Sequence, residues 1–588
     1  MTETLPFDSA QYFKNWVKPL VNSVYADLGV DIDRLCERIS TLLGPYINNE
    51  ARQQKSKWNQ SDVLLITYGD SLTNGKRTPL QVLNVFLSEH LVGTVSAVHI
   101  LPFFPYSSDD GFAVIDYTQV NTELGDWDDI QHISQQFDLM SDLVVNHISS
   151  QSLWFKQFTQ GEKPGCDYFI PTDPKTDLSS VTRPRNSSLL CPVETPQGMQ
   201  HVWATFSHDQ VDVNFANPDV LLEYLKIVLL YLDKGTRIFR LDAIGYLWKD
   251  VGTPCIHHPK THAIVKLIRE VLYMVSPEAV LITETNVPNR ENLTYFGNCN
   301  EAHVIYNFSL PPLLVNALLQ GRSDHLKTWM MSMPPAPLGC AYLNFTASHD
   351  GIGMRPTEGL LDEDEYRTFL RCMKEFGGEI SMRARADGSE SPYEINISLF
   401  DAMKGTAKGE DKWQIQRFLC SQTIMMSLEG IPAFYIHSFL ATPNDRKGLE
   451  QTGRNRSINR YQWDLEHLNG LLADPKSPQA IVFKELSRLI QIRRQQPAFH
   501  PNATQYTLHI KRALFAFWRQ SKHREQSIFS IHNLTARTQK VQLRELNLIV
   551  TDPWFDLIGG STIEEGQAEL TLKAYQSIWL SNLCGVTH

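Results

Sequence analysis

The feature that most constrains how this chain can fold is a set of short apolar runs that end in charged or polar residues. Within Arg237–Tyr246 (RIFRLDAIGY), a short strand at Ile238–Leu241 is followed directly by the carboxylate of Asp242. In a (β/α)8 barrel, parallel strands deliver polar groups at their C-terminal ends, where the active site is built. Three further runs have the same character: Val280–Asn286 (VLITETN), Tyr342–Asp350 (YLNFTASHD) and Leu139–His147 (LMSDLVVNH).

The number of apolar runs indicates how many strands the fold contains. Helical stretches separate them. One begins at Asn217-Pro218, a favourable N-cap and first helical residue, and continues through Val220–Leu232 to Gly235. Eight strands alternating with helices match the barrel, and a doubly wound sheet rarely reaches that number. We therefore predict an α/β fold with a (β/α)8 TIM barrel. The candidate strands are Val63–Thr67, Ala97–Leu101, Leu139–Val145, Ile238–Leu241, Val280–Thr283, Val304–Phe308, Ala341–Phe345 and Ile431–Ile436.

The remaining segments predict additions to the barrel. The N-terminal part is amphipathic and helical, most clearly over Val30–Leu43. After the third strand, a stretch rich in Pro, Gly, Asp and Ser shows no convincing helix and reads as an excursion domain. A long insertion after the seventh strand is typical of a functional lid. The predicted units are 1–60, the helical extension; 61–147 and 216–500, the barrel; 148–215, the excursion domain; 351–415, the lid; and 501–588, an all-β domain with candidate strands Gln505–Ile510, Leu514–Trp518, Ser527–Ile531, Leu546–Val550 and Ser577–Leu580.

Composition excludes several classes of protein. The net charge is −11 and no block is rich in Lys and Arg, which argues against a nucleic-acid partner. No run reaches about eighteen apolar residues, so we expect no membrane span, and residues 1–30 lack the pattern of a signal peptide. Nine cysteines without CxxC spacing favour free thiols in a reducing compartment. We predict a cytoplasmic enzyme without a cofactor, and a homodimer is one open option.

Asp242 and Glu284 form a candidate pair for retaining glycoside chemistry. Arg240 and Asp242 are two residues apart, so alternation places both on one side of the strand. The arginine favours the ionised carboxylate that a nucleophile needs, although a purely structural ion pair fits this pattern about equally well. Glu284 follows an apolar run, which tends to raise a carboxyl pKa. Retaining glycosidases need two carboxyl groups roughly 5–5.5 Å apart, and neighbouring strands lie about 4.8 Å apart.

Asp350, His147 and His349 extend this set of residues. Asp350 is expected to bind sugar hydroxyls more strongly as the ring flattens toward the transition state. A histidine seen alone is more often a satisfied core residue. At strand ends beside carboxylates, donation to ring hydroxyls is the favoured interpretation. The sequence has no HExxH or HxH spacing, so we expect no metal site.

Four of these motifs resemble the signature motifs of the α-amylase family, glycoside hydrolase family 13. They are VNH at 145–147, RLDA at 240–243, ETN at 284–286 and HD at 349–350. The resemblance implies that Asp242 is the nucleophile, Glu284 the general acid/base and Asp350 the transition-state stabiliser. It also implies an excursion domain after the third strand and a β-structured C-terminal domain.

Within that family the chain resembles the sucrose phosphorylase group. The matching stretches include LPFFPYSSDDGFAVIDY, WATFSHDQVDVN and QTGRNRSINR. The resemblance implies transfer of glucose to phosphate with retention. It also implies that Asp109 and an arginine of the 454–460 run, for which we favour Arg460, close the far side of the glucose subsite. Phe206 would cover the glucosyl intermediate, unless it is a packing residue, and Gln210 would line the pocket.

Phosphate must enter where the leaving group departs, so a cation is needed there. Arg183 and Arg185, in the RPR of the excursion domain, are the first candidates. Arg383 and Arg385 of the lid are the second. A solvated surface role is about as compatible with each of these arginines.

The lid departs from the sucrose-specific pattern at Tyr393-Glu394, where those enzymes carry Tyr-Gln. A carboxylate accepts hydrogen bonds from hydroxyls and suits a small polyol, so the chain looks more like the glucosylglycerate and glucosylglycerol phosphorylases. On this interpretation Glu394→Gln shifts preference toward sucrose. The alternatives are a sucrose-specific phosphorylase, a hydrolase or transglucosidase with the same carboxylates, and a non-catalytic binding relative. The expected partners are therefore a small glucoside and inorganic phosphate.

Overall fold

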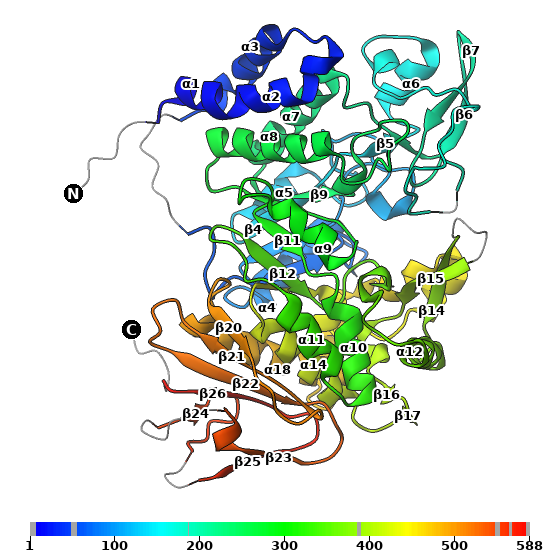
Figure 1. The fold of residues 1–588 in the computed structure, drawn as a ribbon. Coiled ribbons are helices and arrows are strands. Elements are labelled where there is room, and N and C mark those ends of the chain that lie inside the picture. Colours follow the sequence, from blue (N-terminus) through cyan, green and yellow to red (C-terminus); the bar gives the residue numbers. More distant parts are fainter. Residues whose placement is uncertain are drawn as a thin grey trace.

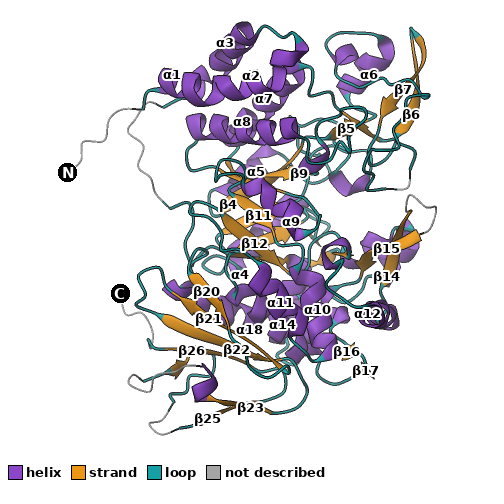
Figure 2. Ribbon diagram, viewed as in Figure 1, coloured by secondary structure: helices purple, strands orange, loops and turns teal. Residues whose placement is uncertain are grey.

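The computed structural model describes residues 7–48, 56–185, 187–384, 390–546, 553–563 and 567–583. Parallel strands close into an eight-stranded barrel at its centre (Figures 1 and 2). The predicted TIM barrel is confirmed, and each barrel strand overlaps one of the predicted runs. The strands follow chain order around the barrel: β1 (Leu64–Thr67), β3 (Ala97–Ile100), β4 (Asp138–Val144), β9 (Thr236–Asp242), β10 (Val280–Thr283), β11 (Val304–Tyr306), β12 (Ala341–Phe345) and β18 (Ile431–Tyr435).

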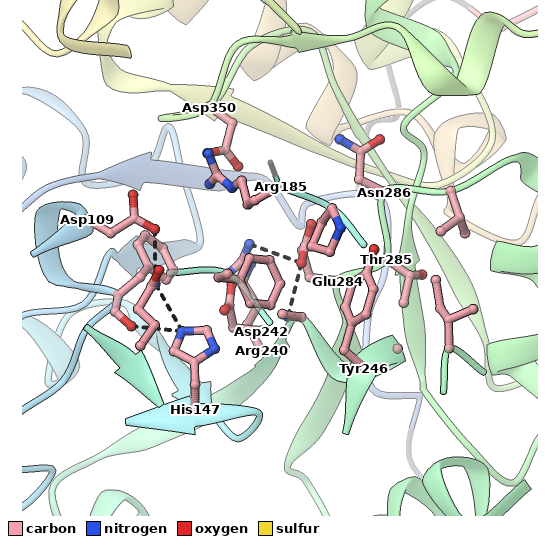
Figure 3. Close-up of a pocket in the computed structure, with 18 of the residues that line it drawn as sticks. Asp109, His147, Arg185, Arg240, Asp242, Tyr246, Glu284, Thr285, Asn286 and Asp350 are labelled. Atoms are coloured by element: carbon pink, nitrogen blue, oxygen red, sulfur yellow. Dashed lines mark hydrogen bonds and ion pairs between the residues drawn. The ribbon is translucent and has the colours of Figure 1, made fainter. Parts of the chain in front are cut away.

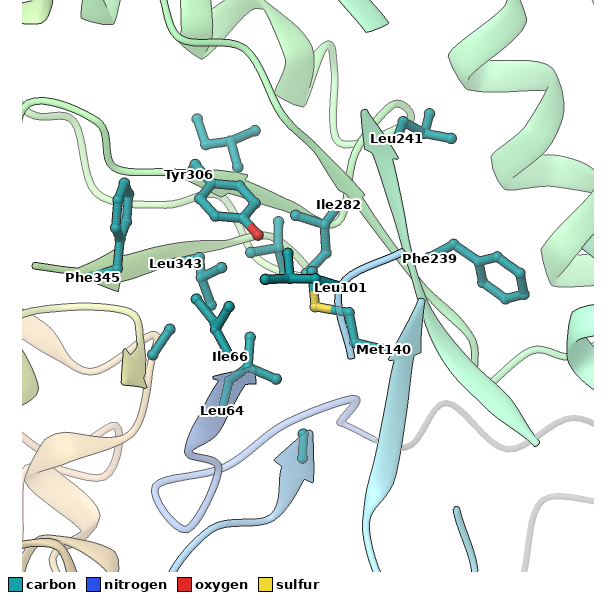
Figure 4. Packing of buried hydrophobic residues seen from close by; sticks show 14 of the residues in the cluster. Leu64, Ile66, Leu101, Met140, Phe239, Leu241, Ile282, Tyr306, Leu343 and Phe345 are labelled. Atoms are coloured by element: carbon teal, nitrogen blue, oxygen red, sulfur yellow. The ribbon is translucent and has the colours of Figure 1, made fainter. Parts of the chain in front are cut away.

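Alternation along β9 decides which of its side chains enter the barrel. Phe239 and Leu241 point away from the apolar group to which Ile282 belongs (Figure 4). Both are fully buried, as expected for a parallel sheet whose outer face is covered by helices. Arg240 and Asp242 take the alternate positions and face inward, where they are also buried. Two charged residues on a core strand are therefore explained by their place at its active-site end.

The barrel helices begin and end where local sequence signals predict. α7 (Pro218–Asp233) starts after Asn217, whose side chain accepts a hydrogen bond from the backbone N–H of Asp219. Gly235 adopts φ +94° just beyond the end of the helix, a conformation that favours glycine. The other long helices around the barrel are α4 (Pro79–His90), α5 (Trp127–Ser134), α8 (Pro259–Val275), α10 (Leu310–Gln320), α14 (Gln414–Ser427) and α18 (Pro478–Arg494).

The N-terminal helices cover two of the barrel helices. α2 (Lys18–Tyr25) lies against α8, and α3 (Ile32–Leu43) contacts α7 (Figure 1). The buried face of α3 carries Leu35, Ile39 and Leu43, spaced four residues apart. The predicted amphipathic helix is confirmed. The limit of this unit at residue 60 stays a prediction.

The excursion segment contains a helix that the sequence analysis did not predict. α6 (Leu153–Gln160) is capped by Ser152, which accepts from the N–H of Phe155, and ends at Gly161 in the left-handed region. The prediction that this segment contains no helix was wrong. The amphipathic pattern of α6 covers only eight residues, and the many Pro, Gly and Ser residues around it hid that pattern in the sequence. The strands of this segment are β5 (His147–Ser149), β6 (Leu190–Thr195), β7 (Gly198–Trp203) and β8 (Gln210–Asp212).

The insertion after β12 forms a small sheet and one long helix beside the barrel. β13 (Ile352–Gly353), β15 (Glu390–Asn396) and β14 (Glu379–Ala384) pair antiparallel in that order. α12 (Glu363–Glu375) precedes β14 and begins after the capping side chain of Asp362. The insertion thus places an ordered strand, β15, next to the loop that follows β12.

The C-terminal region consists of β-strands, as predicted. The candidate strand Leu546–Val550 begins in a 3-10 turn, Leu543–Leu546, and its other residues lie outside the described part of the chain. One sheet contains β20 (Thr504–Thr507), β21 (Leu514–Gln520), β22 (Ser527–Asn533), β26 (Ser577–Ser581) and β24 (Phe555–Asp556), and β23 (Gln539–Gln542) pairs with β25 (Glu569–Leu572).

Eight cysteines in the described ranges are free, and no described helix is both long and apolar enough to cross a bilayer.

Candidate active site

Three carboxylates from separate strands line one cavity at the C-terminal end of the barrel. Asp242 is the last residue of β9, Glu284 directly follows β10, and Asp350 lies in the loop after β12. Asp242 and Glu284 are neighbours across the sheet, since the backbone N–H of Glu284 donates to the carbonyl of Leu241 over 3.1 Å. Figure 3 shows this pair beside Arg240, with Asp350 farther up in the view. The structure thus brings together the acidic residues that the sequence singled out.

Arg240 is shared among three carboxylates, which come from β4, from β9 and from the residue after β10. Its Nη1 lies 2.7 Å from Oδ1 of Asp242, and its Nη2 lies 4.0 Å from Oε2 of Glu284. The same guanidinium pairs with Asp142 of β4, whose second oxygen is 2.6 Å from Nε2 of His99. Burial opposes ionisation of Asp142, but Arg240 and His99 hold its pKa down at about 2. Arg240 therefore neutralises a buried charge that the sequence analysis had not considered.

Burial raises the pKa of both Asp242 and Glu284. For Asp242, Glu284 and Asp142 add to the effect of burial, and the ion pair with Arg240 offsets it only in part. The pairing of Arg240 with Asp242 expected from the sequence is present and favours the ionised form, but burial has the larger effect on the pKa of Asp242, and the arginine also pairs with Asp142. The raised pKa expected for Glu284 is confirmed in direction. Two such groups in one cavity favour a state that holds a single proton between them.

Backbone geometry orients Glu284 toward the end of β9. The N–H of Ala243 donates to Oε2 of Glu284 over 3.1 Å. Ala243 has φ +49°, a left-handed conformation that is unfavourable for a residue with a Cβ. The turn after Asp242 therefore directs an amide at the carboxyl group of Glu284.

Asp350 is surrounded by positive and polar groups. Nη1 of Arg456 lies 2.6 Å from its Oδ1, and Nε2 of His349 lies 3.5 Å from its Oδ2. Burial disfavours the charge, but the nearby arginines, above all Arg456, more than offset this, so the pKa of Asp350 lies below its ordinary value. His349 stacks on Phe112 with ring centroids 5.0 Å apart, and burial lowers its pKa to about 3. His349 is therefore neutral beside an ionised Asp350.

A second set of residues, most of them polar, lines the same cavity. Nε2 of Gln210 donates to Oδ2 of Asp109 over 3.1 Å, and Nε2 of His147 lies 3.0 Å from the carbonyl of Phe112. The ring of Phe206 is 5.1 Å from that of His147. These predicted residues line the same cavity as the carboxylates.

Asp109 reaches the cavity from a tight left-handed turn. Asp109 and Asp110 have φ +53° and +48°, and Gly111 has φ +111°. A Cβ on Gly111 would lie 2.7 Å from the carbonyl oxygen of Pro102, so only glycine fits there. Consecutive left-handed residues are strained. Here the turn points one carboxylate at the cavity and leaves Asp110 to pair with Arg460.

A buried lysine fastens the excursion segment to the barrel at this site. Nζ of Lys249 lies 2.9 Å from Oδ2 of Asp212 on β8 and 2.7 Å from Oδ1 of Asn146 at the end of β4. It also donates to the carbonyl of Tyr246. Because this one cation joins three segments, it fixes the wall of the cavity that carries His147.

Arg460 and Glu394 lie beside the main cavity rather than on it. Arg460 pairs with Asp110, and its Nε donates to the carbonyl of His349 over 2.9 Å. Both Arg460 and Glu394 line an adjoining cavity. From the same run as Arg460, Arg456 reaches the main cavity and contacts Asp350. Tyr393 lines both cavities.

The candidate phosphate-binding arginines differ in position. Arg185 lines both cavities and makes no ion pair or hydrogen bond with the described part of the chain. Arg183 is exposed and lines neither of these cavities. Arg383 pairs with Glu358 at 2.8 Å, and Arg385 lies outside the described residues. Arg185 is thus the candidate whose position fits an incoming anion.

Several lining residues were missed by the sequence analysis. Tyr246, Asn286, Phe112 and Arg456 all line the main cavity. Tyr246 and Asn286 lie within the very motifs that carried Asp242 and Glu284, four and two residues beyond them. Position relative to a strand end was therefore the usable signal. Arg456 belongs to the 454–460 run from which one arginine was expected, but Arg460 was favoured, because no strand end marks which arginine of this run faces the cavity.

Comparison with known proteins places the chain in a family. A model of the alpha amylase catalytic domain matches residues 92–337. The glucosylglycerate phosphorylase of Spirochaeta thermophila is 43% identical over 91% of this chain and 92% of that protein. The chain belongs to the α-amylase family. The sucrose phosphorylase of Streptococcus mutans is 28% identical over 74% of this chain and 88% of that protein.

Among α-amylase-family structures, the sucrose 6F-phosphate phosphorylase of Thermoanaerobacter thermosaccharolyticum matches with a TM-score of 0.70 and 25% identity, covering 81% of this chain and 94% of that one. Within the family the chain therefore groups with the glycoside phosphorylases, which are glycosyltransferase-type enzymes. The resemblance inferred from the four short motifs is confirmed.

Proposed function

We propose that this enzyme transfers the α-glucosyl group of a small α-glucoside, with glucosylglycerate as the first choice, to phosphate with retention. The products are α-glucose 1-phosphate and glycerate. The observation that carries the proposal is the single cavity lined by Asp242, Glu284 and Asp350, with the guanidinium of Arg185, which has no ion-pair partner among the described residues, at its edge. Similarity to a glucosylglycerate phosphorylase over nearly the whole chain supports this choice over glucosylglycerol and sucrose.

In the first step, Asp242 attacks C1 of the glucosyl group while Glu284 gives its proton to the glycosidic oxygen. The C1–oxygen bond breaks, an ester forms between C1 and Asp242, and glycerate leaves as the alcohol. Of the two ways to place the single proton of this pair, the direct contact of Arg240 with Asp242 favours the one with the negative charge on Asp242 and the proton on Glu284. Asp350, held as an anion, stabilises the positive charge that develops on the ring.

In the second step, a phosphate oxygen attacks C1 on the face that glycerate left. Glu284 accepts the proton of the attacking phosphate, and the ester bond to Asp242 breaks. Two inversions at C1 give net retention. Arg185 is the proposed phosphate ligand, and the carboxylate of glycerate meets the same cation in the first step.

The test is to incubate the enzyme with glucosylglycerate in the presence and absence of inorganic phosphate and to measure glucose 1-phosphate. We expect formation that depends on added phosphate. Glucose released at the same rate without phosphate identifies a hydrolase instead. The three acceptors are ranked by the rate of the reverse reaction, with glucose 1-phosphate as the donor and glycerate, glycerol or fructose as the acceptor. A preference for fructose would identify a sucrose-type enzyme.

A further inference from the structure

We propose that Glu394 of the lid is a positioning residue, which holds Arg456 against Asp350 and so lets the lid set the geometry of the third carboxylate. The inference rests on the proposed function of this site. It assigns Glu394 a role through Arg456 rather than through contact with the departing group.

The two oxygens of Glu394 are both taken up by Arg456. Oε2 lies 3.1 Å from Nε and Oε1 lies 2.9 Å from Nη2 of the guanidinium, a bidentate pairing. The side chain of Glu394 is 4% exposed and that of Arg456 is 19% exposed. Bidentate pairs of this kind are strong and fix the plane of the guanidinium. A hydroxyl of a bound ligand must compete with this pairing to reach Glu394.

The remaining edge of Arg456 is turned to the reaction centre. Its Nη1 lies 2.6 Å from Oδ1 of Asp350. One rigid guanidinium therefore joins a lid carboxylate on one side to a catalytic carboxylate on the other. Moving the lid carboxylate moves the donor that Asp350 receives.

Backbone contacts place Glu394 directly against the loop that carries Asp350. Glu394 pairs with Gly353 in the sheet formed by β15 and β13. A Cβ added to Gly351 would lie 2.5 Å from Cγ of Glu394, so this residue next to Asp350 has room only for hydrogen. The close packing and the ion pair act on the same loop.

The cavities favour the positioning role over direct contact with the departing group. Glu394 lines the adjoining cavity and not the one that holds Asp242 and Glu284. Arg456 lines both. An effect of Glu394 on the reaction therefore has a direct structural route through Arg456.

The first experiment uses α-glucosyl fluoride, whose fluoride leaving group carries no hydroxyls and needs no proton from Glu284. Attack by Asp242 breaks the C1–fluorine bond and forms the same ester. We expect Glu394→Gln to slow fluoride release about 10- to 100-fold at saturating substrate, because a small displacement of a catalytic group has effects of this size. Equal fluoride release by the parent enzyme and the variant would overturn the proposal.

The matched control is Glu358→Gln, which removes the other Glu–Arg pair of the lid. Glu358 lies 2.8 Å from Arg383 and is 55% exposed. We expect this variant to release fluoride at the parent rate. An equal loss in both variants would show a general weakening of the lid and would contradict the specific role of Glu394. Absence of phosphate-dependent product in the parent enzyme, by contrast, would defeat the proposed function and not this inference.

The second experiment asks whether Glu394 acts through Arg456. We expect Glu394→Gln to lower the rate strongly in the parent background and to have no further effect in an Arg456→Met background, because coupled residues are not additive. Arg456→Lys gives the same test if the methionine variant does not fold, since an ammonium cannot bridge both carboxylates in this way. Full additivity, or a loss confined to one of glycerate, glycerol and fructose, would assign Glu394 to ligand contact instead.

Discussion

Two ends of one cavity treat their acidic side chains in opposite ways. At the β9–β10 end, burial and mutual repulsion raise the pKa of Asp242 and Glu284. At the β12 end, the charge of Arg456, with that of Arg460, overcomes burial and lowers the pKa of Asp350. The side chain of Asp350 is 25% exposed, against 11% for Asp242 and 15% for Glu284, and the two ends also differ in how positive charge is distributed around these carboxylates.

The distribution follows from which partners each arginine has. Arg240 pairs with both Asp142 and Asp242. Much of its positive charge therefore stabilises Asp142, which takes no part in the proposed reaction. Arg456 is also divided, between Glu394 and Asp350, but the guanidinium of Arg460 acts on Asp350 as well. One end is therefore suited to moving a proton, and the other to keeping a fixed negative charge. Retaining glycosyl transfer needs both.

The largest expected effect tests the β9–β10 end directly. Asp242→Ala removes the proposed nucleophile, and we expect phosphate-dependent transfer to fall by about 10⁴-fold or more. Circular dichroism and thermal melting should show a folded protein. Near-normal turnover in a folded variant would show that Asp242 is not the nucleophile. It would also contradict the assignment of the chemical step to the β9–β10 end of the cavity.

A second variant separates proton donation from the rest of the chemistry. Glu284→Gln should reduce turnover of glucosylglycerate by about 10²- to 10⁴-fold, because the leaving oxygen loses its acid. Glucosylation by α-glucosyl fluoride should be much less affected, since fluoride needs no proton. Steady-state kinetics with glucosylglycerate and a burst of fluoride release with the second donor provide the measurements. Equal losses with both donors would mean that Glu284 does more than donate a proton.

The sequence predicted the barrel well because each strand is a compact apolar run with a polar end. Asp242, Glu284 and Asp350 were found for the same reason, since position at a strand end is local information. Asp142 was not found, although it lies in the predicted third strand, because a buried acid inside an apolar run has no partner visible in sequence. The partner, Arg240, is nearly a hundred residues away along the chain.

The arginines were harder to predict than the acids. The resemblance favoured Arg460, and the structure places Arg456 against Asp350 while Arg460 pairs with Asp110. The two arginines are four residues apart, one within the short 3-10 helix Asn455–Asn459 and the other directly after it, and no apolar periodicity in this stretch indicates which one faces the cavity. Glu394 was likewise interpreted as an acceptor for the hydroxyls of a small polyol. Its pairing with Arg456 depends on the lid packing against a distant loop.

The pH dependence of the reaction sharpens the contrast. A required acid with a raised pKa is protonated at low pH, so the rate with glucosylglycerate should fall as pH rises through the raised pKa of the Asp242–Glu284 pair. The rate of glucosylation by α-glucosyl fluoride should lack this alkaline fall. Profiles of kcat/KM for both donors between pH 5 and about 9 are the measurement. If kcat/KM fell at the same alkaline pH with both donors, the group that titrates would not be the acid that protonates the leaving oxygen.

The smallest effect concerns stability, and it has opposite signs at the two ends. A raised pKa means that the folded protein disfavours the ionised form of Asp242, so Asp242→Asn should raise the free energy of unfolding at pH 7 by about 1 kcal/mol. A lowered pKa means that the charge of Asp350 stabilises the fold above its unfolded pKa, and that this contribution is lost as pH falls through the folded value. Asp350→Asn should therefore lower the free energy of unfolding at pH 7 by about 2 kcal/mol, because Arg456 loses a charged partner. The measurement is urea unfolding of both variants and the parent at pH 7. If the free energy of unfolding changes in the same direction in both variants, the two carboxylates do not differ in the way that their arginine contacts indicate.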